Sequence, residues 1–139
     1  MQQLSVFVQN HPGALADVTQ ALAEKSINIR AFSLYDTPDF NILRLITDKP
    51  EETRALLQEK GFFCKETQVL GIALRDRPGE LNAILQLLKG GGIQIAYIYS
   101  LALPTGTADE DSCPAIPLLI LSSEQQEAAR ELLKDYTIY

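Results

Sequence analysis

Apolar residues recur along the chain with two periods, one typical of β-strands and one typical of α-helices. Leu4–Val8 is an apolar run rich in β-forming residues, which predicts a buried strand. After a polar turn, apolar positions recur at the spacing of one helix face; they are Leu15, Val18, Ala21 and Leu22. A second helix is predicted to open with a capping box formed by Asp48 and Glu51 and to end at Gly61. Further strands are predicted over residues 27–34, 42–47 and 62–67.

The second half of the chain repeats this order of elements. Helices are predicted over residues 79–89 and 123–133, the latter opened by a capping box of Ser123 and Gln126. Strands are predicted over residues 69–74, 93–103, 118–121 and 136–139. The loop over residues 104–117 is longer than its counterpart in the first half by about nine residues.

The turn that follows the first strand is itself repeated. Its sequence is Asn-His-Pro-Gly-Ala-Leu over residues 10–15 and Asp-Arg-Pro-Gly-Glu-Leu over residues 76–81, an offset of 66 residues. At that offset, eight of the 33 positions from Leu4 to Asp36 are identical. Such a repeat indicates a duplicated domain, so we expect two domains over residues 1–68 and 69–139. Domains of this size bury only about 60% of their unfolded surface, which favours further packing on another domain or chain.

Each half therefore has the order strand-helix-strand-strand-helix-strand. With right-handed crossovers, this order folds into an antiparallel sheet with both helices on one face. The predicted fold class is α+β, with two tandem βαββαβ ferredoxin-like sandwiches.

Charge and composition exclude several classes of function. The net charge is −6, divided as −2 and −4 between residues 1–69 and 70–139, and no basic block is present. Nucleic acids and anionic membranes are therefore unexpected partners. No apolar run approaches the ~20 residues that span a bilayer, and no signal-peptide pattern is present. Cys64 and Cys113 lie in different settings, so we expect no disulfide and a cytoplasmic location.

The repeated turn is the main candidate for chemistry. The first N–H groups of the helix that begins near Gly13 lack internal partners and favour an anion. Asn28, at the start of the next strand, offers both an amide oxygen and an NH2 group. An anion site beside a polar acceptor suits the carboxylate and ammonium groups of an amino acid. The alternative is a purely structural role, in which Pro12 and Gly13 make the turn and Asn28 ends a strand.

The turn over residues 10–15, followed after one helix by Ile27-Asn28-Ile29, resembles the signature of the ACT domain family. The second turn, followed by Ile93-Gln94-Ile95, resembles it again, so the resemblance covers essentially the whole chain. It implies the ferredoxin-like fold and a regulatory module that binds free amino acids at an interface between two ACT domains. Ser26 departs from the glycine of many members, whereas Gly92 keeps it.

The resemblance also implies which residues contact the ligand. In serine-inhibited members, the contacts come from the positions that match Asn10 and Asn28 and from backbone around Gly13 to Leu15. Asp76 and Gln94 replace the two asparagines in the second copy, so that copy is expected to be altered, empty or used for packing. The full candidate set is Asn10, His11, Gly13, Ala14, Leu15, Asn28 and Ile29 in the first copy, and Asp76, Arg77, Gly79, Glu80, Leu81, Gln94 and Ile95 in the second.

We therefore expect a non-enzymatic sensor that binds a free amino acid and transmits occupancy to a partner, such as a metabolic enzyme or regulator. A homodimer is expected because sheet edges and interfacial sites both favour one. No cofactor is expected. The main alternative is a structural or regulatory subunit of an amino-acid-metabolism enzyme, without a ligand of its own.

Other functions of the same fold are disfavoured. An acylphosphatase needs an arginine in the first turn, where none occurs, and no nucleophile with a base is evident. His11 is the single histidine, which excludes a multi-histidine metal site, and Asp109–Asp111 lacks calcium-loop spacing. RNA-binding sandwiches stack bases on aromatics of the two central strands, where only Phe7 is expected here.

Overall fold

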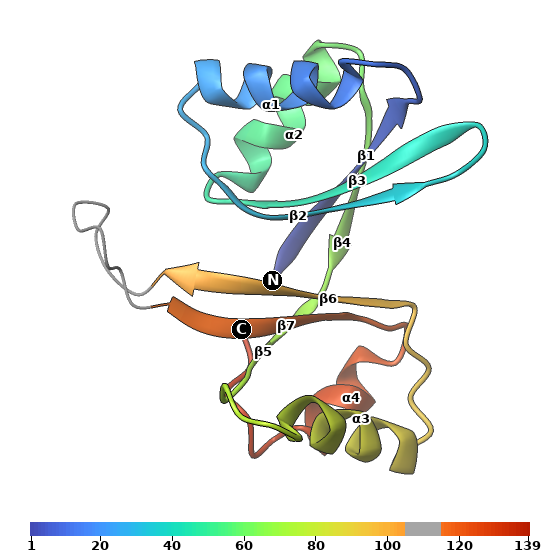
Figure 1. The fold of residues 1–139 in the computed structure, drawn as a ribbon, viewed down its shortest axis with the longest axis vertical. Helices are drawn as coiled ribbons and strands as arrows, with labels where there is room; N and C mark the ends of the chain where they lie inside the picture. The colour runs from blue at the N-terminus through green and yellow to red at the C-terminus, as the bar shows by residue number, and fades with distance from the viewer. Residues whose placement is uncertain (105–114) are drawn as a thin grey trace. The chain divides into compact units, whose positions relative to one another are not determined.

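The computed structural model describes residues 1–104 and 115–139 (Figure 1), and these form two compact units. The N-terminal unit is Gln2–Thr67, and the C-terminal unit is Met1 together with Gln68–Tyr139. Cys113 and the acidic segment Asp109–Asp111 lie outside the described residues. None of the helices in the described ranges is long and apolar enough to span a membrane.

The N-terminal unit is a four-stranded sheet with two helices on one face (Figure 1). Its strand order is β2-β3-β1-β4, and β3 pairs antiparallel with both β1 and β2. The elements are β1 (Gln2–Gln9), α1 (Ala14–Glu24), β2 (Ile29–Asp36), β3 (Phe40–Thr47), α2 (Pro50–Glu59) and β4 (Phe63–Gln68).

The core of this unit lies between the helices and the sheet, as the apolar periods require. The alternate residues Leu4, Val6 and Val8 of β1 are buried in one core cluster with the apolar side of α1. Val18 and Leu22 on that helix are fully buried beside Leu43 and Leu45 of β3. Truncating a buried leucine of this kind to alanine destabilises a protein by about 2–5 kcal/mol, so the position of α1 on the sheet is strongly held.

The C-terminal unit repeats the arrangement with a shorter sheet. Strands in the described residues follow the order β5-β7-β6, all antiparallel. The elements are β5 (Leu70–Ala73), α3 (Glu80–Gly90), β6 (Tyr97–Pro104), β7 (Ala115–Ser122) and α4 (Gln126–Leu132).

The prediction of a last strand over residues 136–139 is wrong. This segment forms only an isolated bridge between Ile138 and Ile72, although Gly71 and Tyr139 exchange two backbone hydrogen bonds. The segment is short and its partner β5 has only four residues, so pairing stops before a ladder forms.

The strands after the first helix of each unit begin later than predicted, and both predicted capping boxes are wrong. The N–H of Asn28 donates to Asp48 Oδ1 (2.9 Å), and the N–H of Gln94 donates to Gln125 Oε1 (2.9 Å). These N–H groups therefore take side-chain partners instead of strand partners. Ser123 Oγ donates to the Gln94 carbonyl (2.7 Å) and also accepts from the Gln125 N–H (3.1 Å). Neither helix has a side-chain hydrogen bond from its N-cap residue, which is Lys49 in one and Gln125 in the other.

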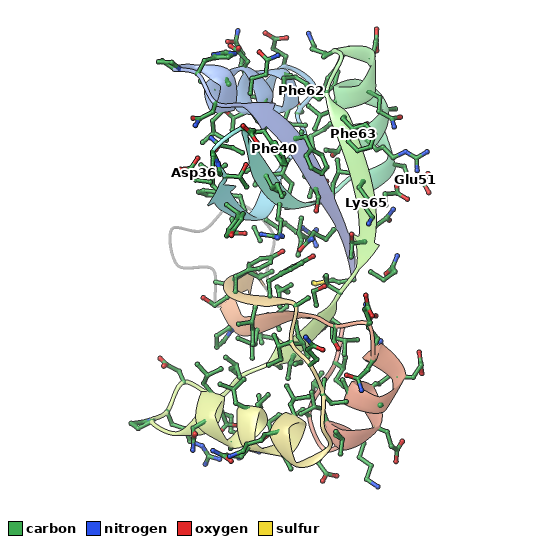
Figure 2. The ribbon with its side chains drawn as sticks, turned by 90° about the vertical axis from the view of Figure 1, so that its right-hand side faces the viewer. Asp36, Phe40, Glu51, Phe62, Phe63 and Lys65 are labelled. Atoms are coloured by element: carbon green, nitrogen blue, oxygen red, sulfur yellow. The ribbon has the colours of Figure 1, made fainter. Side chains whose placement is uncertain are left out.

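The opposite face of the N-terminal sheet carries an aromatic row. The ring of Phe7 packs against Phe40 and Phe63 with centroids 5.4 and 5.2 Å apart. Phe40 and Phe63 are labelled in Figure 2. The prediction of a single aromatic on the central strands is wrong, because β3 begins at Phe40 instead of Ile42. The rings are tilted by 48° and 59° and contact one another, which is unlike an open platform for stacked bases.

Candidate functional site

The first Pro-Gly turn is built around a glycine in a left-handed conformation. Gly13 has φ +87° and directly precedes α1. Replacing Gly13 by a residue with a side chain would destabilise the folded protein by about 1–2 kcal/mol, so this turn favours glycine. Two backbone hydrogen bonds close this turn. The His11 N–H donates to the Gln9 carbonyl (3.0 Å), and the Ala14 N–H donates to the His11 carbonyl (3.3 Å).

This turn leaves hydrogen-bond donors at the start of α1. Within the described part of the chain, the backbone N–H groups of Leu15 and Ala16 donate to no acceptor, whereas the Asp17 N–H donates to the Gly13 carbonyl (3.0 Å). Free N–H groups at a helix N-terminus carry the positive end of the helix dipole. The turn therefore favours an anionic group at its surface.

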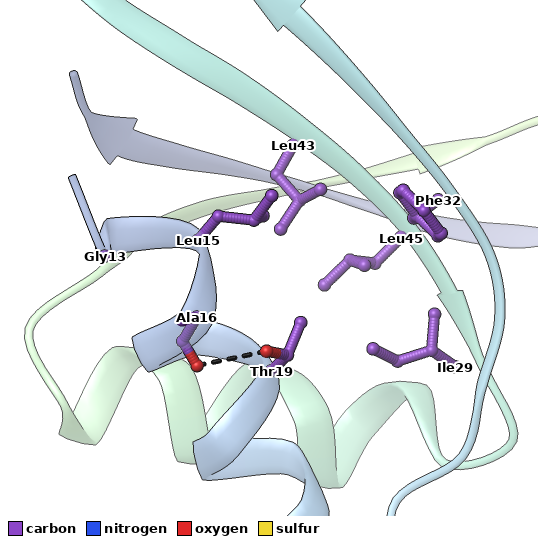
Figure 3. A pocket seen from close by; sticks show the side chains of 8 residues that line it. All are labelled: Gly13, Leu15, Ala16, Thr19, Ile29, Phe32, Leu43 and Leu45. Carbon is purple, nitrogen blue, oxygen red and sulfur yellow. Dashed lines mark hydrogen bonds between the residues drawn. The ribbon is translucent and has the colours of Figure 1, made fainter. Parts of the chain in front are cut away.

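An apolar cavity of about 560 Å³ opens beside these donors, between α1 and the β2–β3 half of the sheet (Figure 3). Its walls are Gly13, Leu15, Ala16, Thr19, Ile29, Phe32, Leu43 and Leu45. The volume falls within the ~300–1,000 Å³ of ordinary small-molecule sites.

The cavity exists because α1 presents small side chains to this half of the sheet. Ala16 and Thr19 are three residues apart and so lie on the same side of the helix. They stand opposite Leu43 and Leu45, whose side chains point to the helix face of β3. The Thr19 hydroxyl donates to the Ala16 carbonyl (3.0 Å, dashed in Figure 3). That bond leaves the cavity wall without a free hydroxyl proton.

One side of the cavity is open to solvent. Phe32 lies on the edge strand β2 opposite Leu45 and is 66% exposed, and Leu15 on the rim is 36% exposed. Apolar side chains exposed together at the mouth of a cavity are a feature of surfaces that bind a ligand or another protein, whereas single ones occur on any surface.

Three residues predicted from the sequence line this cavity, namely Gly13, Leu15 and Ile29. His11 and Ala14 line a different hollow of about 360 Å³, next to Phe63. The exposed Asn10 and Asn28 line neither hollow.

Asn28 is nevertheless held in place at the start of β2. Its N–H donates to Asp48 Oδ1 (2.9 Å), and its carbonyl accepts from the Asp48 N–H (3.1 Å). Both bonds use backbone atoms of Asn28, so its side-chain amide is not engaged by this pair. Ile29, the next residue, enters the cavity wall.

The second Pro-Gly turn has the same backbone conformation as the first but different side chains. Gly79 has φ +89° and precedes α3. Glu80 is only 7% exposed, and its Oε2 accepts from Arg77 Nε (2.7 Å). Both residues line a polar hollow of about 440 Å³ that also contains Arg75 and Asp135.

The other candidates of the second copy are spread apart. Asp76, Leu81 and Gln94 are exposed, and Ile95 packs against the core of the C-terminal unit. The Gln94 carbonyl accepts from Ser123 Oγ (2.7 Å). The structure therefore groups Arg77 with Glu80 and leaves the remaining candidates outside their hollow.

Five residues that line the cavity were not among the candidates from the sequence, namely Ala16, Thr19, Phe32, Leu43 and Leu45. A signal for them exists in the repeat. Asn82 and Leu85 occupy the positions 66 residues after Ala16 and Thr19, so the first copy has the smaller side chains at both places.

The described residues offer little for catalysis or metal binding. No group of three or more His, Cys, Asp or Glu side chains there is arranged to hold a metal ion. Cys64 is a free thiol whose pKa is raised by burial, against the smaller opposite effect of the Arg54 guanidinium. A raised pKa keeps the thiol protonated and weakly nucleophilic at neutral pH.

A family model described as an ACT domain pair matches residues 1–134. The crystal structure of protein BT0572 from Bacteroides thetaiotaomicron is 28% identical in sequence, with a TM-score of 0.84, covering 99% of this chain and 90% of that one. No curated protein matches the chain.

Two further solved structures share the fold at lower identity. The regulatory subunit of aspartate kinase from Thermus thermophilus, in its ligand free form, is 20% identical with a TM-score of 0.61, covering 96% of this chain and 91% of that one. The corresponding subunit from Thermus flavus is 19% identical with a TM-score of 0.59, covering 96% and 90%. The predicted α+β fold of tandem ferredoxin-like units is confirmed by the sheet topology together with these matches.

Proposed function

This chain belongs to the ACT domain family as an ACT domain pair, and from that premise we propose that it is a non-enzymatic regulatory protein that binds a free amino acid. The observation that carries the proposal is the pairing of two features in the N-terminal unit. The N–H groups of Leu15 and Ala16, which have no acceptor among the described residues, belong to the same two residues that line the apolar cavity. A small molecule with a carboxylate at one end suits this arrangement.

The proposed ligand lies across the mouth of the cavity. Its carboxylate accepts hydrogen bonds from the first N–H groups of α1, close to Gly13, where the missing side chain leaves room. Its side chain enters the cavity. The side-chain oxygen of Asn28, one residue before the cavity wall at Ile29, accepts a hydrogen bond from the ammonium group.

Occupancy is proposed to act through a partner. The open side at Phe32 and Leu15 supports closure of the site by an ACT domain of a second copy of the chain, as a homodimer. The regulatory subunits of aspartate kinase that share the fold support a metabolic enzyme as the protein that responds. A ligand shifts such an assembly only as far as it binds one state more tightly than the other.

A thermal-shift screen of the full chain against the free amino acids tests this function. Binding to the folded state raises the melting temperature by mass action, by an amount equivalent to about 2.7 kcal/mol when the ligand is at 100 times its Kd. We expect a rise for one chemical group of amino acids. A flat result across all of them would contradict the sensor function and favour the alternative, a subunit without a ligand of its own.

A further inference from the structure

We infer that the amino acid bound by the N-terminal unit has a bulky apolar side chain, of the size of leucine, isoleucine or phenylalanine. The inference rests on the proposed function and adds the chemical class of the ligand. It is carried by the walls of the cavity between α1 and the β2–β3 half of the sheet.

The lining side chains offer a polar ligand side chain no free hydrogen-bond donor and a single acceptor, the Thr19 hydroxyl oxygen. Thr19 is the one lining residue with a polar side-chain atom, and its hydroxyl donates to the Ala16 carbonyl. Thr19 Oγ1 can still accept one hydrogen bond, but the lining side chains offer no free donor, so a hydroxyl, amide or charged group would leave most of its hydrogen bonds with water unreplaced, which weakens binding. Serine, threonine and asparagine are therefore disfavoured as ligands.

The charges of the lining residues also favour an apolar ligand side chain. The lining contains no acidic side chain to pair with lysine or arginine and no basic side chain to pair with aspartate or glutamate. Beside the cavity, at the start of α1, lie the N–H groups of Leu15 and Ala16, which donate to no acceptor in residues 1–104 and 115–139. The site thus matches a ligand with one anionic end and an uncharged apolar tail.

The size of the cavity selects among apolar amino acids. A space of about 560 Å³ is much larger than the methyl group of alanine needs. Each methylene group that fills an apolar pocket tightens binding by about tenfold or more. Leucine, isoleucine and phenylalanine are therefore expected to bind more tightly than valine, and valine more tightly than alanine.

The C-terminal unit gives a matched contrast. Asn82 and Leu85 stand on α3 where Ala16 and Thr19 stand on α1, and both are larger than their counterparts. Leu85 is half-buried, so its side chain occupies space on the sheet side of α3. We therefore expect one apolar amino acid per chain, bound in the N-terminal unit.

The test is a calorimetric titration of the full chain with leucine, isoleucine, phenylalanine, alanine, serine, aspartate and lysine. We expect the three bulky apolar amino acids to bind at least about tenfold more tightly than the other four, with one site per chain. Tightest binding of serine, aspartate or lysine would overturn this inference and leave the proposed sensor function intact. Absence of binding by every amino acid tested in the thermal-shift screen would instead overturn the proposed function.

Two substitutions test whether the side chain of the ligand occupies this cavity. Ala16→Leu fills the space from α1, and we expect it to weaken leucine binding at least about tenfold. Its control is Asn82→Leu, the same change at the same position of the second copy, which should leave the affinity unchanged. Both positions are exposed on a helix, where leucine is a good helix former, so both variants should fold. Equal affinity of wild type and Ala16→Leu for leucine would overturn the assignment of the side-chain pocket.

Discussion

Gly13 and Gly79 have nearly the same backbone conformation, with φ of +87° and +89°, and each precedes a helix of 11 residues. The residues around them differ. His11 and Ala14 in the first turn correspond to Arg77 and Glu80 in the second, where the buried Glu80 carboxylate accepts a hydrogen bond from Arg77. The second turn thus contains its own carboxylate at the first position of the helix, whereas the first carboxylate of α1 is Asp17, three positions further on.

This difference shows how one backbone supports two roles. A helix N-terminus favours a negative charge whether the charge belongs to the chain or to a ligand. In the second turn, Glu80 supplies that charge permanently. In the first turn, Ala14 is too small and apolar to do so, and the neighbouring small residues leave the cavity open. The comparison predicts that the two turns respond differently to matched substitutions.

Gly13→Asp should have the largest effect on binding. An aspartate there places a negative charge where the ligand carboxylate is proposed to lie, and like charges placed together cost several kcal/mol, equivalent to about a hundredfold or more in affinity. Gly79→Asp, with the same left-handed backbone and the same open space around its Cβ, should leave leucine affinity unchanged. Calorimetric titration of both variants checks the contrast.

Gly13→Asn separates charge from backbone strain. Asparagine matches aspartate in shape and tolerates the left-handed conformation better than most residues. We expect this variant to bind leucine more tightly than Gly13→Asp does. Equal affinities for the two variants would show that shape or strain, and not charge, is responsible, and would count against a carboxylate at this turn.

Asn28→Ala should have the next largest effect. Loss of a hydrogen bond to a charged ammonium group costs about 1.5–3 kcal/mol, which corresponds to roughly tenfold or more in affinity. The substitution should weaken leucine binding and leave 4-methyl-2-oxopentanoate, which has the same side chain and no ammonium group, unaffected. Gln94→Ala is the matched control. Equal losses for both ligands would place Asn28 outside contact with the ammonium group.

The two units also show which features local sequence can predict. The order of elements, the glycine turns and the buried faces of α1 and α3 follow from apolar periods and from Pro-Gly pairs, and these were predicted. The cavity depends on how the side chains of Ala16 and Thr19 meet Leu43 and Leu45 from a distant strand, so it was not predicted.

Long-range partners also explain the errors at element ends. The spacing of Asp48 and Glu51 predicts a capping box. In the structure the Asp48 carboxylate accepts instead from the Asn28 N–H, 20 residues away in the sequence. Ser123 has a partner of each kind, because its Oγ donates to the distant Gln94 carbonyl (2.7 Å) and accepts from the nearby Gln125 N–H (3.1 Å). Sequence spacing identifies residues able to cap a helix, while tertiary structure decides what they bind.

Glu80→Ala tests the internal carboxylate of the second turn. The change gives the second turn the residue of the first and removes the ion pair with Arg77, whose side chain is 60% exposed. Because solvent screens that partner, we expect a loss of only about 1 kcal/mol in the free energy of unfolding. Urea unfolding measures the loss, and leucine affinity should not change. A double-mutant cycle with Arg77→Ala should recover most of the effect as coupling, and additive losses would mean that the two side chains act independently.

Asp48→Ala should have the smallest effect, and it tests whether the start of β2 must be held for the site to work. Asp48 Oδ1 and Gln125 Oε1 make equivalent bonds to Asn28 and Gln94, each 2.9 Å long and exposed. Water replaces much of an exposed hydrogen bond, so each alanine variant should lose only about 0.5–1 kcal/mol in the free energy of unfolding.

The effects of Asp48→Ala and Gln125→Ala on binding should differ, because Asn28 borders the cavity wall at Ile29 and Gln94 belongs to the other unit. We expect Asp48→Ala to weaken leucine binding by about two- to fivefold, since a difference below 1 kcal/mol corresponds to less than tenfold, and Gln125→Ala to leave it unchanged. Unchanged leucine affinity in Asp48→Ala would mean that the site tolerates a loosened Asn28, and the asparagine would then matter only through its side chain.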